Sequence, residues 1–182
     1  TFTGAPVGTN YNFRVNGGSV QNGALSTFTT SALTNGQTVD VIVTSAAGCS
    51  GTSGVITMTV NGNPVAGLTS SDGDNIICAG TGVTFTGSGG SSYEFFVDGT
   101  SVQSGLSATY ATSVLSGGQT VTVKVSNAAG CSTTSAGITT VVNANPVASL
   151  VSNDSDNIIC AGTSVTFTGA PVGTNYNFRV NG

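Results

Sequence analysis

Apolar and polar residues alternate along much of this chain, in short segments separated by turn residues. In the middle third the alternation covers residues 83–86, 93–97, 108–112, 120–125 and 138–142. A period of two, in segments rich in Val, Ile, Thr, Phe and Tyr, is typical of half-buried β-strands. Residues 64–68, matched by 146–150, and residues 101–103 complete seven predicted strands. No segment has the 3.6-residue period of a capped helix, so we expect an all-β fold.

Turn signals follow the same predicted strand three times, as Asn16-Gly17, Asp98-Gly99 and Asn181-Gly182. Such pairs favour type I′ hairpins, because both central residues of that turn need positive φ. We therefore expect a β-hairpin at each of these places, with residues 101–103 as the return strand of the middle one.

The pattern repeats along the chain. Residues 166–182 (TFTGAPVGTNYNFRVNG) are identical to residues 1–17, and a diverged copy of this segment begins at Thr84. The copies start at intervals of 83 and 82 residues, which indicates two alternating units in a longer polymer. Since the chain opens inside a repeat without an initiator Met, we interpret it as an internal segment of a longer protein.

Seven short strands in about 82 residues fit an immunoglobulin-like β-sandwich, and short linkers predict a rod-like array of such sandwiches. The sequence Asn-x-Asn-Pro-Val marks the predicted boundaries between units, at 61–65 and 143–147. The resulting domains are a repeat lacking its first strand (1–62), a complete repeat (63–144) and the opening strands of a further repeat (145–182). The unfilled strand positions would be completed by adjacent repeats of the same polypeptide, or by another copy of the chain donating residues 145–165.

Charged residues make up only 5% of the chain, against roughly a quarter in an ordinary soluble domain. The net charge is −4 and the three cations, Arg14, Lys124 and Arg179, are scattered, so we expect no nucleic-acid partner. No apolar run approaches the roughly 18 residues of a membrane span, so we expect no membrane insertion. There is no His to act as a base, Lys124 is the single Lys, and Glu94 aligns with Asn12 and Asn177 in the other copies, so we predict that the chain is not an enzyme.

The four cysteines occur in two recurring contexts, Ala-Ala-Gly-Cys-Ser at Cys49 and Cys131, and Ile-Ile-Cys-Ala-Gly at Cys78 and Cys160. The complete repeat contains one of each, so the economical prediction is a disulfide between Cys78 and Cys131. The partners of Cys49 and Cys160 would then lie outside these 182 residues. Four cysteines permit three pairings, and the sequence does not choose between them. In a simple immunoglobulin-like arrangement the two contexts lie at opposite ends of the sandwich, so the loop before Cys78 would have to run along it.

Four of the seven acidic residues fall in one repeated loop that is also rich in Asn, and the members of this loop are Asp72, Asp74, Asn75, Asp154, Asp156 and Asn157. Oxygen ligands at alternate positions suit a hard cation, which makes calcium a candidate cofactor at this loop. The alternative is that these side chains form turns with their own backbone, since the loop has too few ligands for a complete calcium shell.

Phe96 occupies the position of Arg14 in the other copy, so we expect it to face outward. An exposed Phe on alternate units would be a candidate lateral contact between arrays. The remaining aromatic residues could stack on a sugar, although core packing is the more common role of those at inward strand positions.

Three motifs carry a resemblance to a known family. They are Asn-Pro-Val-Ala at the start of each unit, Ser-Asp-Asn-Ile-Ile-Cys-Ala-Gly-Thr-Ser-Val-Thr-Phe-Thr-Gly around Cys160, and Asn-Ala-Ala-Gly-Cys-Ser at 127–132. With these motifs the whole chain resembles the tandem immunoglobulin-like repeats of giant surface adhesins of gliding Bacteroidota, the SprB type of gliding-motility adhesin. The resemblance implies export by the type IX secretion system, an extracellular cell-surface location, and a part in adhesion or gliding motility.

The repeats and the resemblance favour an extracellular structural or adhesive module that forms a stalk or filament of a bacterial surface adhesin. Two alternatives stay open. One is a carbohydrate-binding module of a secreted hydrolase, which would have a polysaccharide partner. The other is a self-assembled fibre in which one chain donates a strand to the next.

Overall fold

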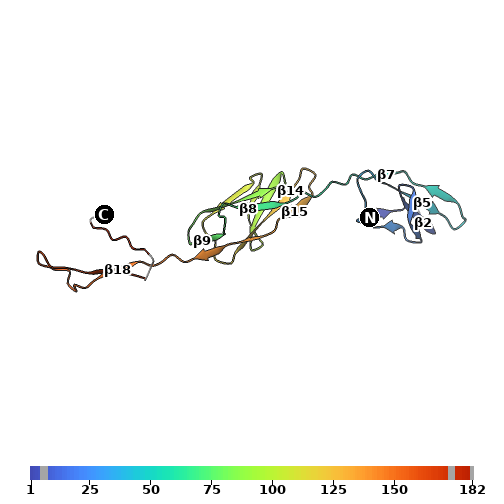
Figure 1. The fold of residues 1–182 in the computed structure, drawn as a ribbon. Coiled ribbons are helices and arrows are strands. Elements are labelled where there is room, and N and C mark those ends of the chain that lie inside the picture. Colours follow the sequence, from blue (N-terminus) through green and yellow to red (C-terminus); the bar gives the residue numbers. More distant parts are fainter. Residues whose placement is uncertain (5–7, 172–174, 181–182) are drawn as a thin grey trace. The chain divides into compact units, whose positions relative to one another are not determined.

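The computed structural model describes residues 1–4, 8–171 and 175–180. Every regular element in these ranges is a β-strand, so the prediction of an all-β fold is confirmed (Figure 1). Over the same ranges, no helix has the length and apolar character needed to cross a membrane. The chain forms two compact units. The first comprises Thr1–Pro64 with Ser126–Thr133, and the second comprises Val65–Val125 with Thr134–Gly182.

The first unit is built around a five-stranded sheet. Its strands are β2 (Asn10–Val15), β3 (Gly18–Gly23), β5 (Thr38–Thr44), β6 (Ser50–Thr52) and β7 (Ile56–Thr57), in the order β3-β2-β5-β6 with β7 also paired to β5. A two-stranded sheet of β1 (Phe2–Thr3) and β4 (Thr27–Phe28) accompanies it. Tyr11, Phe13 and Val41 form the buried core, against which Phe2 and Phe28 pack.

The complete repeat, 63–144, contains the same order of strands a second time. Its five-stranded sheet runs β12-β11-β14-β15 with β16 also paired to β14, and the strands are β11 (Ser92–Val97), β12 (Thr100–Gly105), β14 (Thr120–Ser126), β15 (Ser132–Thr134) and β16 (Ile138–Thr139). A three-stranded sheet has the order β13-β10-β8, formed by β8 (Gly67–Ser70), β10 (Val83–Ser88) and β13 (Thr109–Thr112). Two antiparallel sheets that pack over a core of alternating inward-facing residues are typical of immunoglobulin-like sandwiches.

The core of this sandwich follows from the period-two alternation. Strand β14 buries Val121, Val123 and Val125 completely, while Lys124 between them is exposed. Phe85 and Phe95 are buried as fully and come from β10 and β11, one from each sheet. Burial of each of these side chains contributes on the order of 1.5–3 kcal/mol, so the alternation supplies most of the driving force for closing the sandwich.

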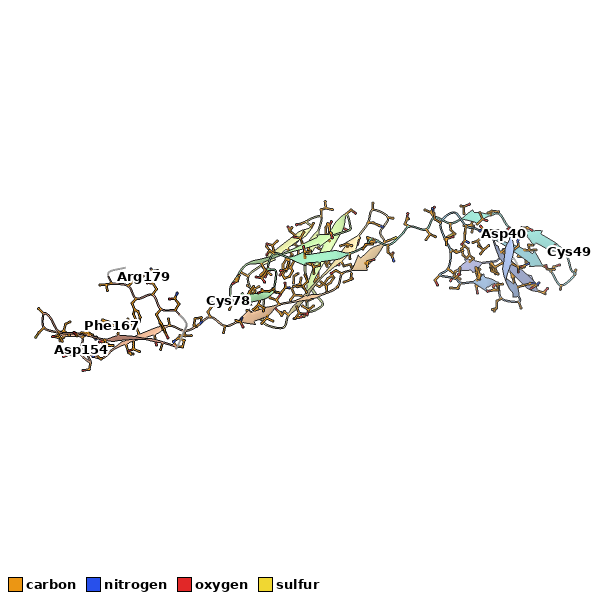
Figure 2. The ribbon with its side chains drawn as sticks, viewed as in Figure 1. Asp40, Cys49, Cys78, Asp154, Phe167 and Arg179 are labelled. Atoms are coloured by element: carbon orange, nitrogen blue, oxygen red, sulfur yellow. The ribbon has the colours of Figure 1, made fainter. Side chains whose placement is uncertain are left out.

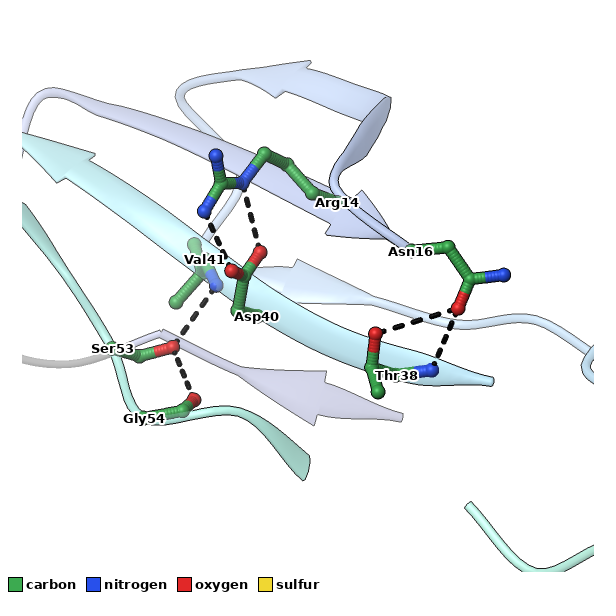
Figure 3. Close-up of polar contacts among 7 residues, drawn as sticks. All are labelled: Arg14, Asn16, Thr38, Asp40, Val41, Ser53 and Gly54. Atoms are coloured by element: carbon green, nitrogen blue, oxygen red, sulfur yellow. Dashed lines mark hydrogen bonds and ion pairs between the residues drawn. The ribbon is translucent and has the colours of Figure 1, made fainter. Parts of the chain in front are cut away.

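Two hairpins have the predicted turn conformation. Asn16 and Gly17 have φ of 50° and 78°, and Asp98 and Gly99 have φ of 50° and 79°. These positive angles belong to the type I′ turn, which confirms the prediction. The turn side chains also bind the neighbouring strand, because Asn16 Oδ1 accepts the Thr38 N–H at 3.0 Å (Figure 3). The third predicted turn, Asn181-Gly182, lies outside the described residues.

The predicted strand 138–142 is divided in the structure. Thr140 is buried between β16, which pairs antiparallel to β14, and β17 (Val141–Asn143), which pairs parallel to β9 (Ile76–Cys78). The segment changes partner at Thr140, so one alternating pattern covers two strands. Strands β9 and β15 were not predicted, since three residues are too few to give a clear alternation.

Residues 145–182 contribute one further antiparallel pair, β18 (Ser149–Ser152) with β19 (Phe167–Ala170). The first strand of each repeat begins later than predicted, at Gly67 and Ser149 instead of Pro64 and Pro146. Val65 and Val147 after these prolines are almost fully exposed, so the Pro-Val segment belongs to a linker and not to a sheet.

Candidate functional site

The Ala-Ala-Gly-Cys turn follows strand β14. It lies against Asn61 and Gly62 in the linker that enters the complete repeat, 63–144, called the central repeat below. Cys131 Sγ donates to the carbonyl oxygen of Asn61 at 3.6 Å, and Asn127 Nδ2 donates to the carbonyl oxygen of Gly62 at 2.9 Å. The turn itself is held by the Cys131 N–H, which donates to Asn127 Oδ1 at 3.0 Å. These contacts attach the cysteine to the linker backbone.

The Ile-Ile-Cys-Ala segment lies against the linker that leaves the same repeat. Cys78 is the register partner of Asn143 in the parallel pair of β9 and β17. The Ala79 N–H donates to the carbonyl oxygen of Asn143 at 2.8 Å, and Asn145 Nδ2 donates to the carbonyl oxygen of Ala79 at 2.9 Å. Ile77 is buried, while Cys78 next to it is exposed, so the thiol is on the outer side of the strand.

All four cysteines are free thiols in the structure, with Cys131 half-buried and Cys49, Cys78 and Cys160 exposed. Figure 2 labels Cys49 and Cys78. The Cys78–Cys131 disulfide stays a prediction. The linker residues Asn61 and Asn143 were not predicted to contact the cysteines, although the recurrence of Asn-x-Asn-Pro-Val marks them in the sequence.

The acidic loops form turns through their own side chains. The Ile76 N–H donates to Asp74 Oδ1 at 3.0 Å and to Asp72 Oδ1 at 3.2 Å. One repeat later the Ile158 N–H donates to Asp156 Oδ1 at 3.0 Å, and the Asn157 N–H to Asp154 Oδ1 at 2.8 Å. Asn75 and Asn157 both have φ of 57°, the left-handed conformation that Asn tolerates in turns.

These hydrogen bonds set the electrostatics of the loops. The Ile76 N–H and then the Asp72 side chain lower the pKa of Asp74, and the Ile158 N–H and then Asp154 lower the pKa of Asp156. Each loop offers two carboxylates and one Asn amide, fewer groups than the six to eight oxygens that Ca²⁺ takes. Among the described residues, no group of three or more His, Cys, Asp or Glu side chains is placed to hold a metal. Calcium binding at these loops stays a prediction.

Phe96 is half-buried, and its neighbour Phe95 is completely buried on the other side of β11. In the first unit the equivalent Arg14 pairs with Asp40 through two hydrogen bonds, from Nε to Oδ1 at 2.8 Å and from Nη2 to Oδ2 at 2.6 Å (Figure 3). Thr122 takes the place of Asp40 in the second unit, so both members of the ion pair are replaced together. The use of Phe96 as a lateral contact stays a prediction.

The open side of residues 145–180 forms a groove of about 830 Å³. Phe167, Tyr176 and Phe178 line it and are substantially exposed, and Arg179 lies at the same groove. These aromatic residues have the same positions in their repeat as Phe2, Tyr11 and Phe13, which pack in the core of the first unit. The groove therefore corresponds to the face that is packed inside the first unit.

No protein family and no curated protein sequence matches the chain. Among solved structures, it is similar to the fibronectin(III)-like modules of Clostridium thermocellum CbhA, with 14% identity and a TM-score of 0.44 over 78% of this chain and 83% of that one. It is also similar to an amphioxus IgVJ-C2 molecule, with 16% identity and a TM-score of 0.36 over 78% and 94%. A third similar structure is Bacteroides ovatus SGBP-B in complex with a mixed-linkage heptasaccharide, with 16% identity and a TM-score of 0.25 over 80% and 40%.

Proposed function

We propose that this chain is part of a non-enzymatic, extracellular repeat protein that forms the stalk or filament of a bacterial surface adhesin. The observation that carries the proposal is a repeated architecture on a repeated sequence. The order β3-β2-β5-β6 with β7 in the first unit recurs as β12-β11-β14-β15 with β16 in the complete repeat, 63–144. The second copy rests on a diverged version of the first sequence, and the first sequence restarts without change at residue 166.

The surface of the chain also supports a structural role. Charged side chains are sparse, and Ser, Thr, Asn and Gly occupy many of the exposed positions. Antiparallel ladders such as that of β2 with β5 pair residues that are more than 20 positions apart in the chain. Pulling the chain apart along its length has to break such ladders together, which suits a module that transmits force. In the SprB-type adhesins that the motifs resemble, this module would be exported by type IX secretion and take part in gliding.

Mechanical unfolding of the intact polypeptide tests the proposal. A train of sandwiches should give a series of force peaks, each releasing the extended length of about one repeat of 82 residues, on the order of 280 Å. An antibody against residues 63–144 should label intact cells without lysis. A single unfolding event, or labelling that requires lysis, would contradict the proposal.

Strand donation between chains is a second candidate function, and the open groove of residues 145–180 favours it. In this alternative, the purified 182-residue chain should form polymers whose size rises with concentration. Light scattering at several concentrations measures this, and a chain that stays monomeric throughout excludes the fibre.

A polysaccharide ligand is the remaining alternative. The exposed aromatic residues in the described ranges are Phe167, Tyr176 and Phe178, and their identical copies in the first unit pack in its core. They are therefore better explained by packing than by sugar stacking. Binding of the chain to a glycan array, abolished by Phe178→Ala, would reverse this preference.

A further inference from the structure

Both cysteine contexts of the central repeat contact a linker, and the two linkers are equivalent. Asn61 and Asn143 are the first residues of the two Asn-x-Asn-Pro-Val sequences, 82 residues apart. The carbonyl oxygen of Asn61 accepts the thiol of Cys131. The carbonyl oxygen of Asn143 accepts the N–H of Ala79, the residue after Cys78. The carbonyl oxygen of the first linker Asn therefore contacts the Ala-Ala-Gly-Cys turn at the entry of a repeat and the Ile-Ile-Cys-Ala segment at its exit.

In a continuing array, each linker is the exit of one repeat and the entry of the next. We infer that each boundary carries a disulfide between the Ile-Ile-Cys cysteine of one repeat and the Ala-Ala-Gly-Cys cysteine of the following repeat. Both thiols then lie beside one Asn carbonyl oxygen, since Cys78 and Asn143 are neighbours in a ladder with strands about 4.8 Å apart. The inference depends on the repeat continuing and does not depend on the proposed adhesive role.

A disulfide within the central repeat is disfavoured by strand β14. Thr120, at the start of β14, pairs with Thr139. Two residues after Thr139 begins β17, the strand that pairs with β9 and contains the register partner of Cys78. Cys131 follows the other end of β14, in a turn closed by the Asn127 N–H donating to the Cys131 carbonyl oxygen. Seven residues of strand extend roughly 20 Å, whereas a disulfide needs Cα atoms within about 7 Å.

The same reasoning explains why the four thiols are free in this chain. The partner of Cys131 would be the Ile-Ile-Cys cysteine of the first repeat, which falls before Thr1 by the repeat interval. The partner of Cys78 would be the next copy of Cys49, which falls after Gly182. Neither boundary within these residues therefore contains both of its cysteines.

The chemistry requires a disulfide donor, such as oxidised glutathione or a dithiol-disulfide oxidoreductase outside the cytosol. One cysteine thiolate attacks the donor disulfide and forms a mixed disulfide, releasing one donor thiolate. The second cysteine thiolate then attacks the protein sulfur and releases the other donor thiolate. The two cysteine protons pass to the two released thiolates, so the protein is oxidised by two electrons and the donor is reduced by two.

An extended chain separates the two pairings, because the alternating repeats differ in sequence around each cysteine. The extended chain is made by adding a second copy of residues 18–144 after residue 182, and it contains seven cysteines. After equilibration in a glutathione redox buffer, the thiols are alkylated in acid and the chain is digested with pepsin. We expect peptides linking Cys78 to the second copy of Cys49, and Cys160 to the second copy of Cys131, with three thiols alkylated.

Two controls sharpen the result. The original 182-residue chain should keep all four thiols under the same treatment, since it lacks both partners. C78S in the extended chain should remove only its own cross-link and leave the one at Cys160, with an unchanged far-ultraviolet circular dichroism spectrum. Peptides linking Cys78 to Cys131, or seven free thiols in a folded extended chain, would overturn the inference.

Discussion

Residues 1–17 and 166–182 have the same sequence and reach different structures. In the first copy Asn10–Val15 forms strand β2, which pairs with β3 on one side and β5 on the other. In the second copy residues 175–180 form no strand. Tyr11 and Phe13 are 6% and 1% exposed, whereas the equivalent Tyr176 and Phe178 are 44% and 56% exposed.

Some contacts are the same in both copies. A side chain added at Gly4 would meet the ring of Tyr11 at 2.7 Å, and one added at Gly169 would meet the ring of Tyr176 at 3.0 Å. The close approach of this glycine to this tyrosine therefore comes from the segment itself. The strand conformation of residues 10–15 does not, since these residues pair with β3 and β5, which lie outside the repeated segment. Local sequence fixes the first kind of contact and a distant segment supplies the second.

The largest expected effect comes from supplying the missing partner. If residue 182 is followed by a second copy of residues 18–62, the new copy of β5 can pair with residues 175–180. We expect the amide hydrogen exchange of residues 175–180 to slow by several orders of magnitude, because opening would then require unfolding of a core. Exchange measured by mass spectrometry on both chains provides the comparison.

The matched control replaces the second copy of Val41 by Asp. Val41 is the register partner of Phe13 and is buried, so a charge at the equivalent position blocks the new core without shortening the chain. Exchange in residues 175–180 should then remain fast. Protection that survives this substitution would show that the appended residues act without forming the sandwich.

The next effect concerns the same aromatic residue in two surroundings. Phe13→Ala should destabilise the first unit by about 3–5 kcal/mol, since it removes a fully buried ring that stacks on Phe28. Phe178→Ala in the same 182-residue chain should change stability by less than about 0.5 kcal/mol, because the ring is exposed. Urea unfolding followed by exchange in strand β2 measures both, and equal losses would refute the comparison.

A smaller effect is expected for the arginine of the repeated segment. Arg14 forms a bidentate pair with Asp40, with the two side chains 26% and 12% exposed. Arg14→Ala should lower the urea midpoint of the first unit by less than Phe13→Ala does, because a partly exposed ion pair is screened by water but its two hydrogen bonds are lost. Arg179→Ala should have no measurable effect in this chain. Asp40→Asn should lose about as much as Arg14→Ala, and a double variant should lose little more than either single one.

The sequence predicted what depends on local pattern. The alternation at 83–86, 93–97, 108–112 and 120–125 located β10, β11, β13 and β14, and the Asn-Gly and Asp-Gly pairs located two hairpin turns. It did not locate β9, because this strand exists through parallel pairing with β17, about 65 residues later in the chain. It placed the first strands too early, since prolines and valines of a linker resemble an edge strand when their exposure is unknown.

In the candidate sites, too, the sequence predicted the local features but not the contacts between distant segments. The sequence identified the cysteine contexts and the acidic loops as repeated features, and both recur in the structure with repeated hydrogen bonds. Which linker atom each cysteine context meets could not be derived, because Cys131 and Asn61 are 70 residues apart and come together only in the folded chain. Phe96 was expected to face outward from its alignment with Arg14, and the two residues are both half-buried, each directly after a buried Phe on its strand.

The smallest effect compares the two acidic loops, 72–75 and 154–157, whose sequences differ at one position. The pKa of Asp74 and of Asp156 is lowered in the folded chain, so the ionised form favours the folded loop. This stabilisation is complete above the ordinary pKa of Asp, near 4, and is lost as the pH falls through the lowered folded value.

Carboxyl and amide resonances followed by NMR between pH 6 and 2 should show the Ile76 and Ile158 amides shifting together with Asp74 and Asp156. Asp74→Asn should remove the transition at Ile76 and leave the one at Ile158. The hydrogen bond from the isoleucine N–H to the aspartate two residues before it recurs in both loops. Similar midpoints in both loops would therefore show that the turn is set locally, whereas widely different midpoints would show that the rest of the sandwich controls it.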